Sequence, residues 1–348
     1  MMTLGVEDQL HGQADACTAM GSALCGALLH AAADDYRNRG TVRRFFDADH
    51  DRFKLSRIGI RLLGALHYCA LEGTARSLAS HLPSCGGDGD AIEAWTAAVD
   101  VLDIQAERIG TLFERTPQTN EVARSMPLLA GLLAIARATH LPIRLLDIGA
   151  SAGLNARCDR YRYEGEGWAW GDPTSPLVLR NRSRGGIPAA LDAPLRVSER
   201  LACDLHPLDI GVDRDRLELR SFVWADQLER FERLNSAIMA ANAVPLAVDA
   251  ADMYAWIPIH ARPFDGHATV AMHSIVTEHI TPEMRQSLKA TIEKAGANAR
   301  PSAPFAWVRM EPDSSEQGRY ETRATLMPSG EEWLIARSDG HGQDLEWI

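Results

Sequence analysis

The chain has 348 residues, of which 46% are hydrophobic and 24% charged, and its formal net charge is -11. This composition excludes a globally disordered chain, and the length predicts two domains or one core with a large addition. The negative charge disfavours a broad surface for nucleic acid or for an anionic membrane. We therefore expect a small or neutral partner.

The cysteines and the N-terminal residues indicate a cellular compartment. The six cysteines form no C-x-x-C pair and no His/Cys spacing typical of zinc, so neither a metal site nor a disulfide framework is predicted. Glu7 and Asp8 stand where a secretory signal would be basic, and the run 22–33 is too short to span a bilayer. We expect a cytoplasmic protein with reduced thiols, and nothing indicates an oligomer.

Helical periodicity dominates the chain up to about residue 140. Ile58, Leu62, Leu66 and Cys69 share one stripe, a longer stripe over 92–113 predicts a long helix, and a last helix is expected over 126–139. The sequence thus predicts an all-helical N-terminal domain over 1–140 and an α/β domain over 141–348. Three polar residues precede the last helix, and they fit a capping turn with a surface ion pair: Asn120, Glu121 and Arg124.

Residues 144–155 read R-L-L-D-I-G-A-S-A-G-L-N and form the most informative stretch. The apolar run predicts a buried parallel strand, and Gly149 and Gly153 let the backbone turn sharply against a ligand before a helix over 155–163. A dinucleotide site requires G-x-G-x-x-G, but Ser151 holds the place of its second glycine. An ordinary strand-turn-helix is the alternative to a cofactor site.

Further acids follow predicted strands downstream. Asp204 ends one strand and can accept hydrogen bonds from ribose hydroxyls, and Asp249 with Ala250 ends another, where the acid can accept from an adenine amino group. Asp252 competes with Asp249, or instead caps a helix. A fourth strand, 268–272, leads to His273-Ser274, and strand–helix alternation ends in a hairpin around 328–330.

Residues 164–194 are predicted to be an irregular insertion that can cover the site. They contain Trp168, Trp170 and a basic run of Arg180, Arg182 and Arg184. The insertion delays the acid that a nucleoside site normally shows about 20 residues after the glycine turn.

Several pieces together carry a resemblance: T-N-E-V-A-R, L-D-I-G-A-S-A-G-L-N with D-R-Y-R-Y, G-D-P-T-S-P, C-D-L-H-P-L-D, V-W-A-D-Q, M-H-S-I-V and G-H-G-Q-D-L-E-W. From about residue 120 onward the chain resembles an uncharacterised bacterial family, a domain of unknown function that belongs with the S-adenosylmethionine (SAM)-dependent methyltransferases. Its D-x-G-x-x-x-G looks like motif I of those enzymes. The resemblance implies a Rossmann-like, seven-stranded α/β sheet whose last strand is antiparallel.

The resemblance also implies site residues. SAM would be bound by Asp147, Gly149, Ala150, Ser151, Gly153, Asp204, Asp249, Ala250, His273 and Ser274, with the first five at its methionine end. The acceptor would be bound by Asn120, Glu121, Arg124, Asn155, Tyr161 and Trp170. No metal ligands are implied.

Methyl transfer is an in-line displacement, so a base is needed only if the acceptor carries a proton. His273 is the first candidate base, followed by Glu278 and His341, although a histidine at a strand end is often structural. Tyr161, Tyr163 and Trp170 either shield the sulfonium or anchor the insertion. We expect a methyltransferase for a small-molecule acceptor; the alternatives are an NAD(P)-dependent oxidoreductase and a non-catalytic binding or regulatory protein.

Overall fold

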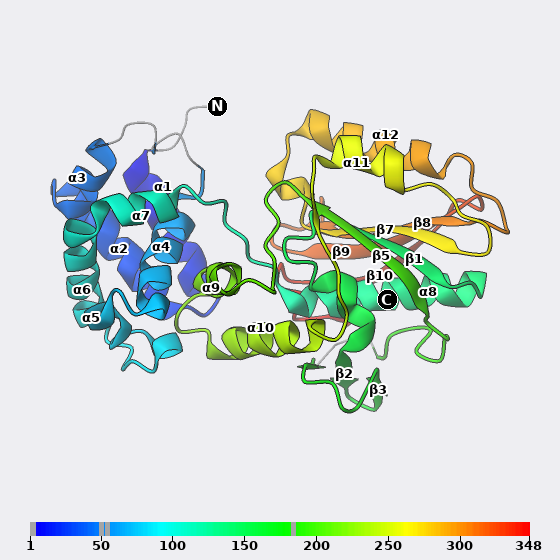
Figure 1. Cartoon of the computed structure of the whole chain (residues 1–348), viewed down its shortest axis with the longest axis horizontal. Coiled ribbons are helices and arrows are strands. Elements are labelled where there is room, and N and C mark those ends of the chain that lie inside the picture. The colour runs from blue at the N-terminus through cyan, green and yellow to red at the C-terminus, as the bar shows by residue number, and fades with distance from the viewer. Residues whose placement is uncertain (1–4, 49–51, 53–55, 182–185) are drawn as a thin grey trace. The chain divides into compact units, whose positions relative to one another are not determined.

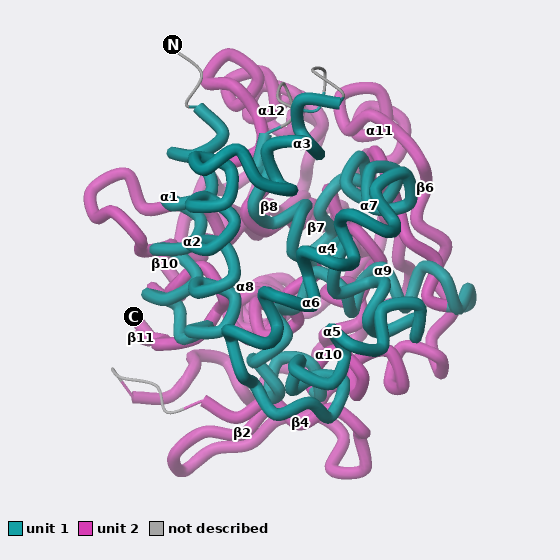
Figure 2. Tube along the Cα trace, turned by 90° about the vertical axis from the view of Figure 1, so that its left-hand side faces the viewer, with its two compact units in different colours: residues 1–119, 211–232 teal, residues 120–210, 233–348 magenta. Residues whose placement is uncertain are grey.

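The computed structural model describes residues 5–48, 52, 56–181 and 186–348. The chain forms two compact units: residues 1–119 with 211–232, and residues 120–210 with 233–348 (Figure 2). The predicted division near residue 140 thus differs from the observed one. The reason is that the helix α8, Ser125–Thr139, packs on strands of the second unit. Two arginines of the predicted basic run, Arg182 and Arg184, lie outside the described residues.

The first unit is helical. Its elements are α1 (Val6–Ala19), α2 (Ala23–Arg37), α3 (Thr41–Asp47), α4 (Ile58–Glu72), α5 (Arg76–Ala79), η2 (Pro83–Cys85), α6 (Ala91–Ile104), α7 (Ala106–Phe113) and α9 (Asp213–Ser221). The helix α10 (Leu228–Ala241) contributes to both units. The predicted stripe on α4 is confirmed, since all four of its residues are buried.

The long helix predicted over 92–113 is wrong. The chain breaks at Gln105, which ends α6 and begins α7 with φ -117° and ψ 29°. Ile92, which the pattern placed on the apolar stripe, is 77% exposed. The apolar spacing therefore continues on both sides of the break at Gln105, so the sequence pattern alone does not show the break.

The second unit contains an eight-stranded sheet. In spatial order its strands are β11 (Glu346–Trp347), β10 (Glu331–Ser338), β9 (Tyr320–Met327), β8 (Phe305–Pro312), β7 (Ala268–Ser274), β1 (Ile143–Ile148), β5 (Val197–Asp204) and β6 (Asp249–Ala250). The part from β6 to β8 is parallel throughout. The predicted mixed α/β fold is confirmed (Figure 1).

The remaining strands form an antiparallel meander, which differs from the seven-stranded sheet expected. Strand β8 pairs antiparallel with β9, β9 with β10, and β10 with β11. Only residues 313–319 join β8 to β9. A parallel crossover requires a dozen or more residues, so this short connection forces the return strand to run antiparallel.

Helices cover both faces of the sheet (Figure 1). On one face, α11 (Met253–His260) and α12 (Pro282–Gly296) share a core with Leu146, Ile148 and Phe305. On the other face, α8 packs so closely that a Cβ at Gly131 would lie 2.7 Å from Cγ1 of Val308. The stretch Val122–Thr139 is apolar and long enough for a membrane span, but 72% of it is buried, as in a core helix.

The predicted irregular insertion has regular structure. It folds as a second, three-stranded sheet in which β2 (Arg162–Gly165) lies between β3 (Trp168–Trp170) and β4 (Val178–Arg180). Strand β2 pairs antiparallel with β3 and parallel with β4. Short strands joined by glycine turns carry little periodicity, which is why the sequence did not predict them.

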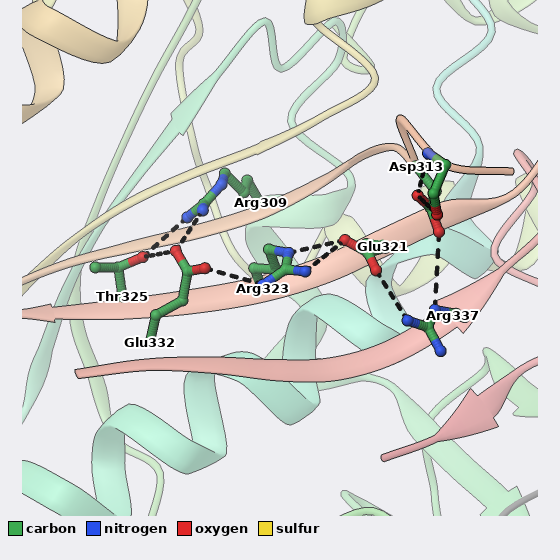
Figure 3. Close-up of polar contacts among 8 residues, drawn as sticks. Arg309, Asp313, Glu321, Arg323, Thr325, Glu332 and Arg337 are labelled. Atoms are coloured by element: carbon green, nitrogen blue, oxygen red, sulfur yellow. Dashed lines mark hydrogen bonds and ion pairs between the residues drawn. The ribbon is translucent and has the colours of Figure 1, made fainter.

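A chain of alternating charges crosses the meander on one sheet face (Figure 3). Glu332 accepts from both Arg309 and Arg323, at 2.6 and 2.9 Å, and Glu321 bridges Arg323 and Arg337. Cross-strand pairs of opposite charge stabilise a sheet register, and a connected network contributes more than isolated surface pairs. These contacts support the meander that ends at the candidate site.

Candidate functional site

The sheet order marks one edge as the candidate site for a ligand. Strand β1 lies between β5 and β7. After β1 the chain adds β5 and β6 on one side of it, and it then adds β7 and β8 on the other side. In open α/β sheets, ligands bind at the carboxyl ends of strands at such a switch point. The turns after β1, β5, β6 and β7, which carry most of the predicted site residues, meet at this edge.

The predicted glycine corner follows β1. Gly149, Ser151 and Gly153 all have positive φ, at 68°, 55° and 68°. The amides of Gly149 and Ala150 donate to the Cys203 carbonyl of β5 at 2.9 and 3.0 Å. A side chain at Gly149 would lie 2.8 Å from Cγ2 of Val276, so glycine is required for close approach as well as for conformation.

The acid after β5 is tied to this corner. Oδ2 of Asp204 accepts from the Ser151 amide at 2.8 Å, and Oδ1 accepts from the His206 amide at 2.9 Å. The next side chain, Leu205, is 63% exposed. A fixed carboxylate beside an exposed apolar side chain suits the sugar and base of a nucleoside.

The acids after β6 have separate roles. Asp249 is exposed and accepts from the Trp256 indole at 2.7 Å, while its neighbour Ala250 pairs in register with Asp204. Asp252 caps α11 by accepting from the Tyr254 amide at 2.8 Å. The sequence alternative that Asp252 caps a helix is therefore confirmed.

Several buried side-chain polar atoms have no hydrogen-bond partner. Within the described part of the chain, seven buried side-chain atoms have no hydrogen-bond partner. Three of them belong to the stretch that forms the corner: Oδ2 of Asp147, Oγ of Ser151 and Oδ1 of Asn155. Buried polar atoms are nearly always paired, so each of these three oxygens is a candidate to accept a hydrogen bond from a ligand.

Asp147 itself has an unusual environment. Burial and the nearby Asp204 carboxylate raise its pKa to about 8, against the opposing effects of the Ala156 amide and Arg157. At neutral pH this side chain is therefore mostly a neutral carboxylic acid in the absence of a cation.

Arg157 stabilises the glycine corner by hydrogen bonds to backbone carbonyls. Its side chain is only 1% exposed, and its guanidinium donates to the carbonyls of Gly153 at 2.8 Å, Ala152 at 3.2 Å and Val244 at 2.9 Å. The helix predicted over 155–163 is replaced by the 3-10 helix η4 (Asn155–Arg160), which is kinked at Arg157. Carbonyls that helical amides would have used are bonded to this arginine instead.

His273 is a structural residue in this geometry, which corrects its assignment as the first candidate base. It is 0% exposed, its Nδ1 lies 2.6 Å from Oε1 of Glu311, and its Nε2 accepts from the Trp307 indole at 2.9 Å. Both ring nitrogens are thus used within the protein. Ser274 follows it at the end of β7 and is partly buried.

Glu311 organises the turn after β7. It accepts from the amides of Val276 and Thr277 at 3.0 and 3.1 Å, in addition to His273. Burial opposes its ionisation, but hydrogen bonds from His273 and Thr277 hold the pKa of Glu311 below its usual value. Ile275, a β-branched residue at φ 56°, is held in a strained conformation by this turn.

Glu278 is the exposed candidate base that remains. It belongs to η5 (Thr277–His279), and its Oε1 accepts from the Tyr320 hydroxyl at 2.5 Å. Tyr320 begins β9 opposite Pro312 and Ser338, so it lies at the same sheet edge as the glycine corner. Burial and Glu278 raise the pKa of Tyr320, so this hydroxyl keeps its proton.

The predicted acceptor residues 120–124 also reach this edge. Oδ1 of Asn120 accepts from the Leu154 amide at 3.4 Å, and Nδ2 of Asn155 donates to the Glu121 carbonyl at 3.3 Å. Nε of Arg124 donates to the Gly340 carbonyl at 2.9 Å, beside His341, whose amide donates to Asp339 at 3.0 Å. The structure therefore brings the first and last pieces of the second unit together.

The profile of a family described as "Uncharacterized protein conserved in bacteria (DUF2332)" matches residues 7–347. The chain belongs to the DUF2332 family. No curated protein and no solved structure matches it.

Glu121 of this DUF2332 protein acts as both a cap and an ion-pair partner. Its carboxylate accepts from the Ala123 amide at 3.1 Å, as a capping turn requires, but its ion pair is buried and joins Arg233 at 3.1 Å. With the Gln343 amide oriented to face Arg233, its oxygen accepts at 2.8 and 3.0 Å. The surface pair suggested by the sequence is thus replaced by a buried one.

Two predicted acceptor-binding residues of the DUF2332 protein do not join the site. Tyr161 is fully buried and donates to the Leu154 carbonyl at 2.5 Å, while Trp170 packs on Tyr163 with ring centroids 6.0 Å apart. Tyr163 is also fully buried. These aromatic residues anchor the insertion, which was the alternative interpretation.

Sequence reasoning missed several residues that shape the site: Arg157, Arg233, Trp307, Glu311 and Tyr320. Each of them bonds to a partner far away in the sequence, which for Arg157 is the Val244 carbonyl, and no local motif marks them. Among the described residues, no group of three or more His, Cys, Asp and Glu side chains is arranged to hold a metal ion.

Proposed function

We propose that this DUF2332 protein is a SAM-dependent methyltransferase that acts on a small-molecule acceptor. The observation that carries the proposal is the group of buried, unpartnered oxygens of Asp147, Ser151 and Asn155 at the corner after the first sheet strand. The α-ammonium group of an amino-acid ligand supplies three donors for such acceptors.

The neighbouring residues fit the rest of SAM. Asp204 lies one strand over, and each of its carboxylate oxygens has two lone pairs, which suits it to accept hydrogen bonds from ribose hydroxyls. Leu205 offers an exposed apolar surface, and Asp249 is exposed at the end of the next strand. The corner after β1 thus matches the amino-acid part of the cofactor, Asp204 matches the sugar, and Leu205 with Asp249 matches the base.

When bound, SAM supplies a methyl group on a sulfonium, which an acceptor atom displaces in line. The protein's task is to hold both reactants and, where needed, to remove a proton. Glu278 is the candidate base because its carboxylate is exposed and is oriented by the Tyr320 hydroxyl. Arg124, whose side chain is fixed by the Gly340 carbonyl, is placed to bind a polar acceptor group.

A nicotinamide dinucleotide fits the corner less well. Its diphosphate would meet the Ser151 side chain at the position that requires glycine, and the Asp147 and Asp204 carboxyl groups beside it. The 3-10 helix η4 also offers less amide dipole than the α-helix that usually faces a diphosphate. Acidic groups instead favour a cationic ligand.

The experiment that tests turnover is incubation of the protein with methyl-labelled SAM and a pool of bacterial small metabolites. We expect the label to move to a small molecule, with S-adenosylhomocysteine formed in equal amount. SAM binding without any label transfer across the pool would instead favour a non-catalytic binding protein. Asp204→Ala serves as the control, because it should lose transfer through loss of cofactor affinity.

A further inference from the structure

We infer that Asp147 changes its charge when the cofactor binds: it is a neutral carboxylic acid in the free protein and becomes the counter-ion of the cofactor's ammonium group. The inference rests on the proposed function and adds a coupling between cofactor binding and proton release. The reaction is balanced: the carboxylic acid and the ammonium cation give a carboxylate–ammonium pair and one proton, which leaves to solvent.

The geometry places Asp147 where it can make this exchange. It lies at the end of β1, its side chain is buried, and Oδ2 has no partner among the described residues. Two further unpartnered oxygens, of Ser151 and Asn155, belong to the same stretch. An ammonium group has three N–H donors, and each of these oxygens accepts hydrogen bonds.

The surrounding groups decide the charge of Asp147. The groups that interact electrostatically with Asp147 are Asp204 and Cys203 of β5, Arg157 and Cys158 of η4, and Tyr161, which follows η4. Burial raises the pKa of Cys203 to about 12 and raises those of Cys158 and Tyr161, so these three groups are neutral at working pH. The balance is therefore between one carboxylate, Asp204, and one guanidinium, Arg157.

Arg157 does not serve as the counter-ion of Asp147. Its donors are directed at the carbonyls of Ala152, Gly153 and Val244. Asp204 is committed in a similar way, because its two oxygens hold the amides of Ser151 and His206. A ligand cation is thus the group that would stabilise ionised Asp147.

The affinity for SAM should depend on pH. Burial and Asp204 raise the pKa of Asp147 to about 8, so below that pH its proton must leave before the ammonium pair forms. The affinity for SAM should rise about tenfold per pH unit between roughly pH 6 and 7.5. Above about pH 8 the gain ends, because an α-amino group itself loses its proton near there.

The test is isothermal titration calorimetry with SAM at about pH 6.5 in buffers of different ionisation enthalpy, with S-adenosylhomocysteine as a second ligand that has the same ammonium group. The wild-type protein should release about one proton for either ligand. Asp147→Asn should still bind but release almost none, and its affinity should be nearly flat with pH. Asp252→Asn, which removes an acid that caps α11 outside the proposed site, should keep the proton release.

Four results would overturn the inference. Binding of SAM by the wild-type protein without proton release would reject it and leave the proposed function intact. Undiminished release by Asp147→Asn would assign the proton to another group. Absence of binding of both ligands would reject the proposed function and the inference together. An NMR titration of the Asp147 carboxyl carbon in the ligand-free protein separates these cases, since a pKa near 4 there would also reject the inference.

Discussion

The backbone amide of Ser151 donates to Oδ2 of Asp204 at 2.8 Å, which joins the corner after β1 to the acid at the end of β5. The methionine and ribose ends of the proposed SAM site are therefore parts of one hydrogen-bonded unit. A substitution of either residue should therefore alter the contacts of both the methionine and the ribose parts of the cofactor.

Asp204→Ala removes the acceptor for the ribose hydroxyls and both amide anchors of the corner. We expect the Kd for SAM to rise at least about tenfold, because hydrogen bonds to a charged group contribute roughly 1.5–3 kcal/mol each. Calorimetry measures the change. Asp252→Ala is the matched control: it removes an acid that caps α11, and it should lower stability by about 1 kcal/mol without a change in SAM affinity. An equal Kd in wild type and Asp204→Ala would argue against the assignment.

Glu278→Gln should lower the rate of methyl transfer by a factor of about 10²–10⁴ if the acceptor carries a proton, with SAM affinity unchanged. Tyr320→Phe should lower it less, because Tyr320 orients Glu278 through one hydrogen bond. Label transfer to the metabolite pool is the readout. Glu283→Gln removes a nearby exposed carboxylate from the first turn of α12 and should be neutral. Equal rates for Glu278→Gln and Glu283→Gln would remove Glu278 from the mechanism.

His273→Asn should act on stability and leave catalysis in place. The substitution deprives the Trp307 indole and the Glu311 carboxylate of their partner, at a cost of about 1–3 kcal/mol for each buried group left unpaired. Urea unfolding measures the loss. A variant that stays folded but loses methyl transfer entirely would restore His273 as a catalytic residue.

Asp147→Asn should make the folded state less sensitive to pH. An Asp whose pKa is raised by folding stabilises the native state most below its unfolded value near 4, and this contribution is lost as pH rises toward about 8. The wild-type protein should therefore lose up to about 1.4 kcal/mol per pH unit across that window relative to the variant. Urea unfolding at several pH values checks the slope, and parallel curves for the two proteins would show that Asp147 is ionised in the fold.

Ser151→Gly should stabilise the protein by roughly 1 kcal/mol, because it removes a side chain from φ 55° and a buried oxygen without a partner. Ala150→Gly, one residue earlier and not at positive φ, should instead destabilise it through backbone entropy. Chemical denaturation distinguishes the two signs. A loss of stability in Ser151→Gly would mean that the serine side chain has a structural partner.

The residues that the sequence could predict are those whose role depends on their immediate neighbours. Gly149 and Gly153 mark a turn because glycine adopts a positive φ at the lowest cost, and Asp204 and Asp249 end apolar runs that read as strands. By contrast, Glu311, Trp307 and Tyr320 matter through partners tens of residues away, and only the sheet register brings them together. For His273 the sequence left a catalytic and a structural role open, because its position was predictable but its two hydrogen-bond partners were not.

The helical unit shows a further limit of periodicity. The kink at Gln105 preserves the apolar spacing on both sides, so the pattern suggested a single helix. The small sheet of the insertion was missed for the opposite reason, because its strands are too short to show a pattern.

The most direct test of the central claim is a calorimetric titration of the wild-type protein with SAM and, separately, with NAD at about pH 7.5. The proposed site predicts saturable one-to-one binding of SAM and no measurable binding of NAD. Binding of NAD in preference to SAM, or no binding of SAM, would contradict the claim that the Asp147–Asn155 corner holds an amino-acid nucleoside.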